Sequence, residues 1–203
     1  MTNQVNIKDS VPSTEKSISD TVSEMLKEVH TCLPGIINSF NAEKQTVEAQ
    51  PTIQRVFTKS GPANLPLCVD VPVVVSGGGD FFITFPIKKG DTCLLLFSER
   101  CIDSWALEDK IAPPEDFRTH DLSDAFALVG VNPVNKAIPN FNTDEAELRN
   151  REGTIKLTLG ASGFVLIGNL HVTGTIMANG KVIDNTHTHP GVQPGSGSTG
   201  TVS

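Results

Sequence analysis

The C-terminal part of the chain constrains the fold most, because its apolar residues come in short alternating runs broken by glycine. Between residues 151 and 186, β-type runs are separated by Gly or by Asn-Gly. Strands this short leave one bare apolar stripe and two unpaired edges, which is unstable for a single chain in water. Three identical chains wound about one axis solve both problems, since their edges pair and their stripes share a core. The sequence therefore predicts an intertwined trimeric β-prism, or β-helix, over residues 151–186.

Alternation assigns six apolar side chains to the inside of this prism. They are Ile155, Leu157, Leu159, Leu170, Val172 and Ile176. His171 then points outward as a solvated side chain. The segment 164–167 is apolar in both registers, so its facing stays open.

Two of the five histidines, His187 and His189, follow the prism and are separated by one residue. In an extended chain they share a face and lie roughly 7 Å apart. The plainest interpretation of the pair is two exposed histidines in a polar terminus, but three copies on an axis would supply six nitrogens. An octahedral shell disfavours Zn, which prefers four ligands, and suits Fe(II) or Ni, of which Fe is the more available. We expect one Fe ion per trimer, with no open coordination position.

The chain before the prism predicts two further parts. Residues 1–32 form an N-terminal segment with a helix over residues 13–30, for which Ser13 is a suitable N-cap. The apolar stripe of this helix either lies on the next domain or pairs with copies of itself. Residues 33–132 carry short β runs with turns between them, including a hairpin at residues 41–43. This pattern predicts a partly open, OB-fold-like barrel.

The remaining segments complete the expected organisation. Residues 76–80 read as a turn, and residues 117–128 do not read as an obvious strand. Residues 133–150 have low hydrophobicity and predict a connector, and residues 187–203 form the metal-binding tip and a Gly/Ser-rich tail. The fold class is thus mainly β: an N-terminal helix, an OB-fold-like barrel, and a trimeric β-prism or β-helix with a metal-capped tip.

A second polar group poses a choice between catalysis and structure. Arg118, His120, Asp121 and Asp124 lie close together in the sequence. We favour a hydrogen-bonded lock that closes a domain over a catalytic cluster, because buried polar groups are usually hydrogen-bonded. The H-x-H pair also opens a metallohydrolase motif, but the Asp and the third His of that motif are absent after His189. We therefore expect no enzymatic activity, no catalytic residue and no small-molecule substrate.

Charge and composition bound the partners. The formal net charge is −7 and the chain has no tyrosine, which argues against nucleic acid as the main partner. Two alternatives stay open: an OB-fold module that binds oligonucleotide or oligosaccharide, and a trimeric receptor-binding fibre tip. The first needs a basic groove with stacking aromatic residues. The second needs polar, aromatic-rich loops. The N-terminus has no apolar signal region, so we expect synthesis in the cytoplasm.

From Leu33 onward the chain resembles the central spike of contractile-tailed bacteriophages, of the baseplate assembly protein V type. The resemblance rests on the OB-like front domain, residues 118–126 that close it, the glycine-punctuated prism and, most specifically, the Thr-His-Thr-His-Pro-Gly end at residues 186–191. It implies a homotrimer whose axial iron is held by His187 and His189 of all three chains. It also implies that the front domain joins the tail hub and baseplate proteins.

The same resemblance implies a mechanical function. The spike would be driven transiently through the host outer membrane when the sheath contracts, as a step in viral genome ejection. It would be assembled in the host cytoplasm and reside in the virion, at the tail baseplate. A phage-tail-like bacteriocin or a type VI-like injector would use the same spike, and the sequence does not choose among them.

Overall fold

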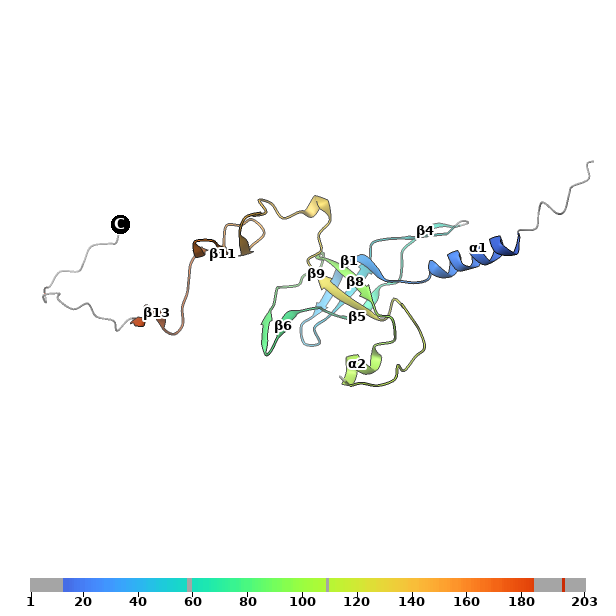
Figure 1. Ribbon diagram of the computed structural model, residues 1–203, viewed down its shortest axis with the longest axis horizontal. Coiled ribbons are helices and arrows are strands. Elements are labelled where there is room, and N and C mark those ends of the chain that lie inside the picture. The colour runs from blue at the N-terminus through green and yellow to red at the C-terminus, as the bar shows by residue number, and fades with distance from the viewer. Residues whose placement is uncertain (1–12, 58–59, 109, 185–194, 196–203) are drawn as a thin grey trace, which may run out of the picture. The chain divides into compact units, whose positions relative to one another are not determined.

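The computed structural model describes residues 13–57, 60–108, 110–184 and 195 (Figure 1). The chain divides into two compact units, Met1–Ala137 and Ile138–Ser203. The fold is mainly β with a short N-terminal helix, as the sequence predicts. Within the described ranges, no helix is both long enough and apolar enough to span a membrane.

Helix α1 (Thr14–Leu26) begins where the sequence predicts. The Ser13 side chain accepts a hydrogen bond from Lys16 N at 3.3 Å, so Ser13 is the N-cap. The helix ends at Leu26, four residues before the predicted end at residue 30, because a turn follows at once and strand β1 starts at Cys32. None of its residues is buried.

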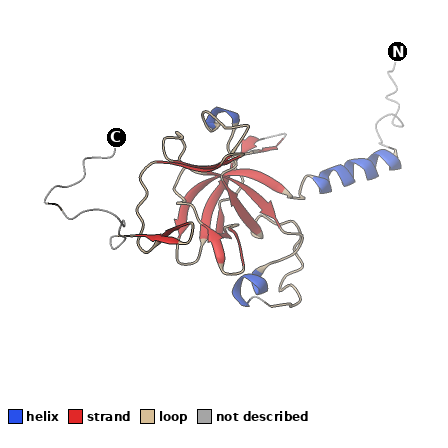
Figure 2. Cartoon of the chain, turned by 60° about the vertical axis from the view of Figure 1, so that its left-hand side comes forward, coloured by secondary structure: helices blue, strands red, loops and turns tan. Residues whose placement is uncertain are grey.

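A curled five-stranded sheet forms the centre of the first unit (Figure 2). Its strand order is β5-β2-β1-β8-β9, and all neighbouring strands are antiparallel. The strands are β1 (Cys32–Asn41), β2 (Thr46–Pro51), β5 (Cys68–Pro72), β8 (Thr92–Phe97) and β9 (Ala125–Val129). A parallel bridge between Val73 and Ala127 brings the two edges of the sheet together. The result is a half-barrel; the OB-fold assignment itself stays a prediction.

Smaller elements decorate this sheet. Two short hairpins and two helical segments lie outside the five-stranded sheet. They are β3 (Arg55–Phe57) with β4 (Gly61–Ala63), β6 (Ser76–Gly78) with β7 (Phe81–Ile83), α2 (Asp103–Glu108) and the 3-10 turn η2 (Val134–Lys136). The predicted hairpin turn after residue 40 is confirmed, since β1 pairs with β2 across it.

The core lies on the concave side of the half-barrel and follows the period of two. Alternate residues are buried in β2, β8 and β9, and the core includes Ile37 on β1, Val47 on β2 and Leu95 on β8. Cys68 and Cys93 belong to this core, and burial raises the pKa of each thiol to about 11. All four cysteines are free, and Cys32 is exposed.

One prediction about the first unit is wrong, and the hairpin turn predicted at residues 76–80 is confirmed with narrower bounds. Residues 125–129 form strand β9, although residues 117–128 do not read as a strand, because the buried positions Ala125 and Ala127 are small and give a weak β signal. Residues 76–80 are more than a turn, since 76–78 form strand β6. The turn itself is Gly79-Asp80, both at positive φ (55° and 70°), as tight hairpins require.

The second unit contains short strands only. Strands β10 (Ala146–Arg149), β11 (Lys156–Gly160) and β12 (Gly163–Ile167) form an antiparallel sheet, and β13 (Ile176–Ala178) pairs with β14 (Lys181–Ile183). Strand β10 lies in the segment that the sequence assigned to a connector. The predicted β run at residues 170–172 is not a strand in the single chain.

Candidate functional site

One face of the β10–β12 sheet is wholly apolar and faces solvent. The register places Leu148, Leu157 and Leu166 side by side, and places Ala146, Leu159 and Phe164 in the next row. We call these six residues the apolar face. The exposed fractions are 57% for Leu148, 38% for Leu157, 49% for Leu159, 72% for Phe164 and 44% for Leu166. The register also answers the question that the sequence left open at residues 164–167: Phe164 and Leu166 lie on the face of Leu157 and Leu159.

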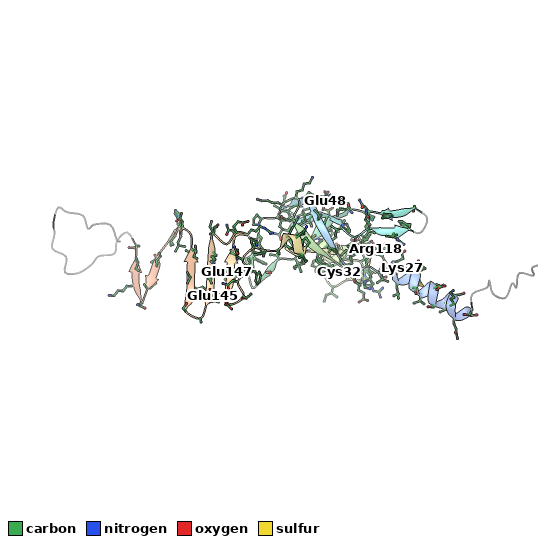
Figure 3. All side chains as sticks on the ribbon, turned by 90° about the horizontal axis from the view of Figure 1, so that it is seen from above. Lys27, Cys32, Glu48, Arg118, Glu145 and Glu147 are labelled. Atoms are coloured by element: carbon green, nitrogen blue, oxygen red, sulfur yellow. The ribbon has the colours of Figure 1, made fainter. Side chains whose placement is uncertain are left out.

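On the opposite face of the same sheet the charged side chains of β10 and β11 are largely covered, whereas Val165 and Ile167 of β12 are 50% and 44% exposed. Glu147 on β10 accepts hydrogen bonds from Lys156 Nζ at 2.5 Å and from Arg149 Nη1 at 3.1 Å (Figure 3). The Glu147 side chain is 5% exposed and the Arg149 side chain 11%. Arg149 also donates to the Asn140 carbonyl at 2.7 Å and to the Pro139 carbonyl at 3.0 Å. A loop of the same chain therefore covers these charged side chains.

Burial in this sheet is the reverse of what a solitary domain requires. A solitary domain buries its apolar side chains and leaves its charges in water. Here the ion pairs are enclosed within the chain while the leucines are bare. The unpaired edges of β10 and β12 add exposed backbone donors and acceptors. The sheet thus exposes an apolar face and two unpaired edges within the described residues.

A second group of polar residues closes the first unit. Arg118 donates to Asp124 from Nε at 2.6 Å and from Nη2 at 2.8 Å, and Nη2 also donates to Asp103 at 2.9 Å. Asp124 is fully buried and accepts from Ile102 N at 3.0 Å. We call Arg118, Asp124 and Asp103 the Arg118 lock. The lock joins the segment before β9 to helix α2, as the hydrogen-bonded alternative predicts for Arg118 and Asp124.

The lock also explains a grouping that resembles a metal site. Among the described residues, Cys101, Asp103 and Asp124 place ligand atoms within 4.8 Å of one another. The Arg118 guanidinium already bridges both carboxylates and supplies the positive charge. Its hydrogen bond holds the pKa of Asp103 below the ordinary value, followed in effect by the hydrogen bond from Cys101. The pKa of Arg118 is raised, first by Asp124 and then by Asp103.

His120 and Asp121 lie apart from the lock. Both line an open cavity of about 650 Å³ beside His30 and Arg55, which neither Arg118 nor Asp124 lines. Within the described part of the chain, the buried Nδ1 of His120 has no hydrogen-bond partner, and the His120 carbonyl accepts from His30 N at 3.3 Å. Asp121 accepts from the Ser123 hydroxyl at 2.6 Å, and hydrogen bonds from Ser123 lower its pKa. Arg118 and Asp124 thus belong to the lock, whereas His120 and Asp121 line the cavity, although all four are close in sequence.

These carboxylates give stability a definite pH dependence. The pKa values of Asp103, Asp121 and Glu147 all lie below their ordinary values in the folded chain, the last through the Lys156 and Asn142 hydrogen bonds. As the pH falls, the carboxylates of the unfolded chain therefore bind protons before those of the folded chain. The stabilisation of the folded chain is present above about pH 4 and is lost as the pH falls through the folded pKa values. We expect the melting temperature to fall between pH 5 and pH 3 in a thermal denaturation series. A melting temperature that holds or rises over this range would contradict the assignment.

His187 and His189, the predicted metal ligands, lie outside the described residues, as does the predicted tail except for Gly195. The prediction of a metal at this pair therefore rests on the donor set alone. Of the prism's six predicted inward residues, Leu157 and Leu159 lie on the apolar face. The inward facing of all six in a trimer stays a prediction.

The half-barrel and the short-strand sheet define a mainly β protein with a short N-terminal helix. Comparison with known families narrows this class. Residues 33–130 match the family model described as phage protein Gp138 N-terminal domain, and residues 185–201 match the GpV Apex motif. The two matches support a phage tail spike-type protein with a structural role in the tail spike or baseplate, and they suggest a location in the virion tail. No curated protein matches the chain.

Proposed function

We propose that this chain is the central spike of a contractile tail baseplate, which pierces the host outer membrane during injection. The spike is a homotrimer. The half-barrel acts as an OB-fold that joins the tail hub, and the residues after 150 form the rigid point. The function is mechanical, so the chain turns over no substrate.

The apolar face carries this proposal. Leu157 and its neighbours are exposed while the charges behind them are enclosed. Partners of the same kind cover such a face most simply, since three copies present three identical apolar stripes to a common axis. Pairing between chains then satisfies the open edges of β10 and β12. Interchain backbone hydrogen bonds along residues 151–186, which we call the shaft, would resist shear. A spike under mechanical load requires this resistance.

A metal at the tip would complete the assembly. His187 and His189 of three chains offer six imidazole nitrogens, a donor set suited to an octahedral Fe(II) ion rather than to tetrahedral Zn. When bound, the ion supplies a closed coordination shell that ties three chain ends together. The match of residues 185–201 to the GpV Apex motif supports a role for this segment at a tip.

The metal proposal predicts a loss on removing the histidines. The variant His187→Ala/His189→Ala should bind no iron and still assemble, because the trimer interface lies in the shaft. Elemental analysis of purified protein should give about one iron per three chains for the wild type, as expected for one site on a three-fold axis. His171→Ala is the control, since it removes an imidazole outside the pair and should keep the metal. Metal-free wild-type protein, or an unchanged iron content in the double variant, would refute the iron clasp.

A further inference from the structure

Helix α1 presents an apolar stripe that none of the described residues of its own chain buries. The exposed fractions are 60% for Ile18, 49% for Val22, 67% for Met25 and 65% for Leu26, and no residue of the helix is buried. Figure 3 shows the side chains of α1 standing clear of the half-barrel. Of the two roles that the sequence leaves open for this stripe, burial on the next domain is not seen among the described residues.

The helix is too short to persist in water without burial. It has 13 residues, and isolated helices below about 12–15 residues are marginal even with favourable sequences. The Lys27–Glu24 ion pair at 2.6 Å is exposed and screened by solvent, so it adds little to the stability of the helix. The stripe therefore needs a partner.

The spacing of the stripe indicates what kind of partner it is. Ile18, Val22 and Met25 follow one another at intervals of four and three, which is the 3.5-residue seam of a coiled coil rather than the broader face of a surface helix. In that frame the seam begins after Glu15. Leu26 flanks the seam, so the apolar surface is widest at the end nearest the half-barrel.

The flanks of the seam favour identical partners. In the same frame, the positions beside the seam within α1 are occupied by Thr14, Ser19, Thr21 and Leu26, all uncharged. Charges at these positions normally select the partner and repel copies of the same helix. The charged residues Asp20 and Glu24 fall on the outer side. Identical helices can therefore approach without like-charge repulsion.

The residues just after α1 are hydrogen-bonded to the half-barrel of their own chain. Glu28, two residues after α1, accepts from Arg55 Nη1 at 2.8 Å, and His30 N donates to the His120 carbonyl at 3.3 Å. In a symmetric trimer these contacts would place the C-terminal ends of the three α1 helices in equivalent positions. The effective concentration of the helices would rise as a result. A seam of three layers is too short to hold free helices together. It can do so when the helices are already tethered to one trimer, because tethering raises their effective concentration.

We infer that the three α1 helices of the trimer pack as a parallel three-stranded coiled coil through Ile18, Val22 and Met25. This inference rests on the proposed trimer and adds a second interface at the opposite end of the sequence from the prism. The occupant of the stripe is a second and a third copy of the same helix.

Site-directed disulfide trapping tests this packing on the full chain. Cys32, which is exposed, is first replaced by Ser to remove its background reaction. Met25→Cys then places a thiol in the seam, and Ser23→Cys, on the outer side of the same turn, is the matched control. Oxidised glutathione serves as the oxidant, and non-reducing electrophoresis measures the yield of linked chains. We expect at least a tenfold higher yield at position 25, with a ceiling near about two-thirds of the chains, because one chain of each trimer stays unpaired.

Light scattering on the reduced samples separates the two possible failures. A trimer that links poorly at position 25, or equally at positions 23 and 25, would overturn the coiled coil, assign the stripe to another protein and leave the trimer intact. A single-chain mass would overturn the trimer and the coiled coil together. A trimer that links selectively at position 25 supports both.

Discussion

Leu157→Asp is expected to abolish assembly of the full chain. Leu157 lies at the centre of the apolar face, paired with Leu148 on one side and Leu166 on the other. In the proposed trimer the substitution brings three carboxylates to the axis without partners, and each unpaired buried charge costs several kcal/mol. A loss of about 5 kcal/mol alone weakens association by roughly four orders of magnitude. At micromolar concentration the variant should therefore elute as single chains, with its mass measured by light scattering.

The control for this variant makes the same chemical change at a different exposed leucine. Leu107 on α2 is 81% exposed, and Leu107→Asp should leave the mass of the assembly unchanged. If Leu157→Asp assembles like the wild type, the apolar face is not the trimer interface. If both variants dissociate, the effect is one of added charge rather than of position.

Asp124→Asn is expected to destabilise the half-barrel by about 3–5 kcal/mol, the usual cost of breaking a buried ion pair by changing one partner. Asp124 is 0% exposed and accepts from both Nε and Nη2 of Arg118, so a neutral amide in its place leaves the largely enclosed guanidinium without its buried counter-charge. The chain's only tryptophan, Trp105, lies on α2 next to the lock and reports its opening by fluorescence. Denaturant unfolding followed at Trp105 measures the loss.

Asp116→Asn is the matched control for the lock. Asp116 also pairs with Arg118, at 3.6 Å, but its side chain is 60% exposed. Exposed pairs contribute about 0–1 kcal/mol, so the same Asp-to-Asn change should have little effect there. Equal losses in the two variants would show that burial of Asp124 does not set the strength of the lock.

The sequence predicts most elements of the first unit because local patterns determine them. The Ser13 cap, the alternation in β2 and the nearly continuous apolar run of β8 are signals within a few residues. Strand β9 escapes prediction because its buried residues are alanines, and its place in the sheet depends on strand β8, which ends about 28 residues earlier in sequence. Strand β10 escapes because its charged residues Glu147 and Arg149 face a covering loop rather than solvent.

In the candidate sites too, partners that are close in sequence could be predicted, and partners that are distant in sequence could not. Arg118 and Asp124 are close in sequence and are correctly predicted as partners, whereas Asp103 comes from a helix 15 residues before Arg118 and gives no local signal. The separation of His120 from the lock depends on the backbone, which places His120 at a φ of 50°. Of the bare leucines of the apolar face, Leu157 and Leu159 were predicted to point inward, whereas their place beside Leu148 and Leu166 becomes visible only in three dimensions.

The molar mass of the wild-type full chain in solution tests the central claim most directly. A single chain has a mass of 21.7 kDa. The account predicts a light-scattering mass three times this value that persists on dilution, because the short strands after residue 150 hide their apolar side only against copies of themselves. A mass of one chain, with the β10–β12 sheet still folded, would contradict it.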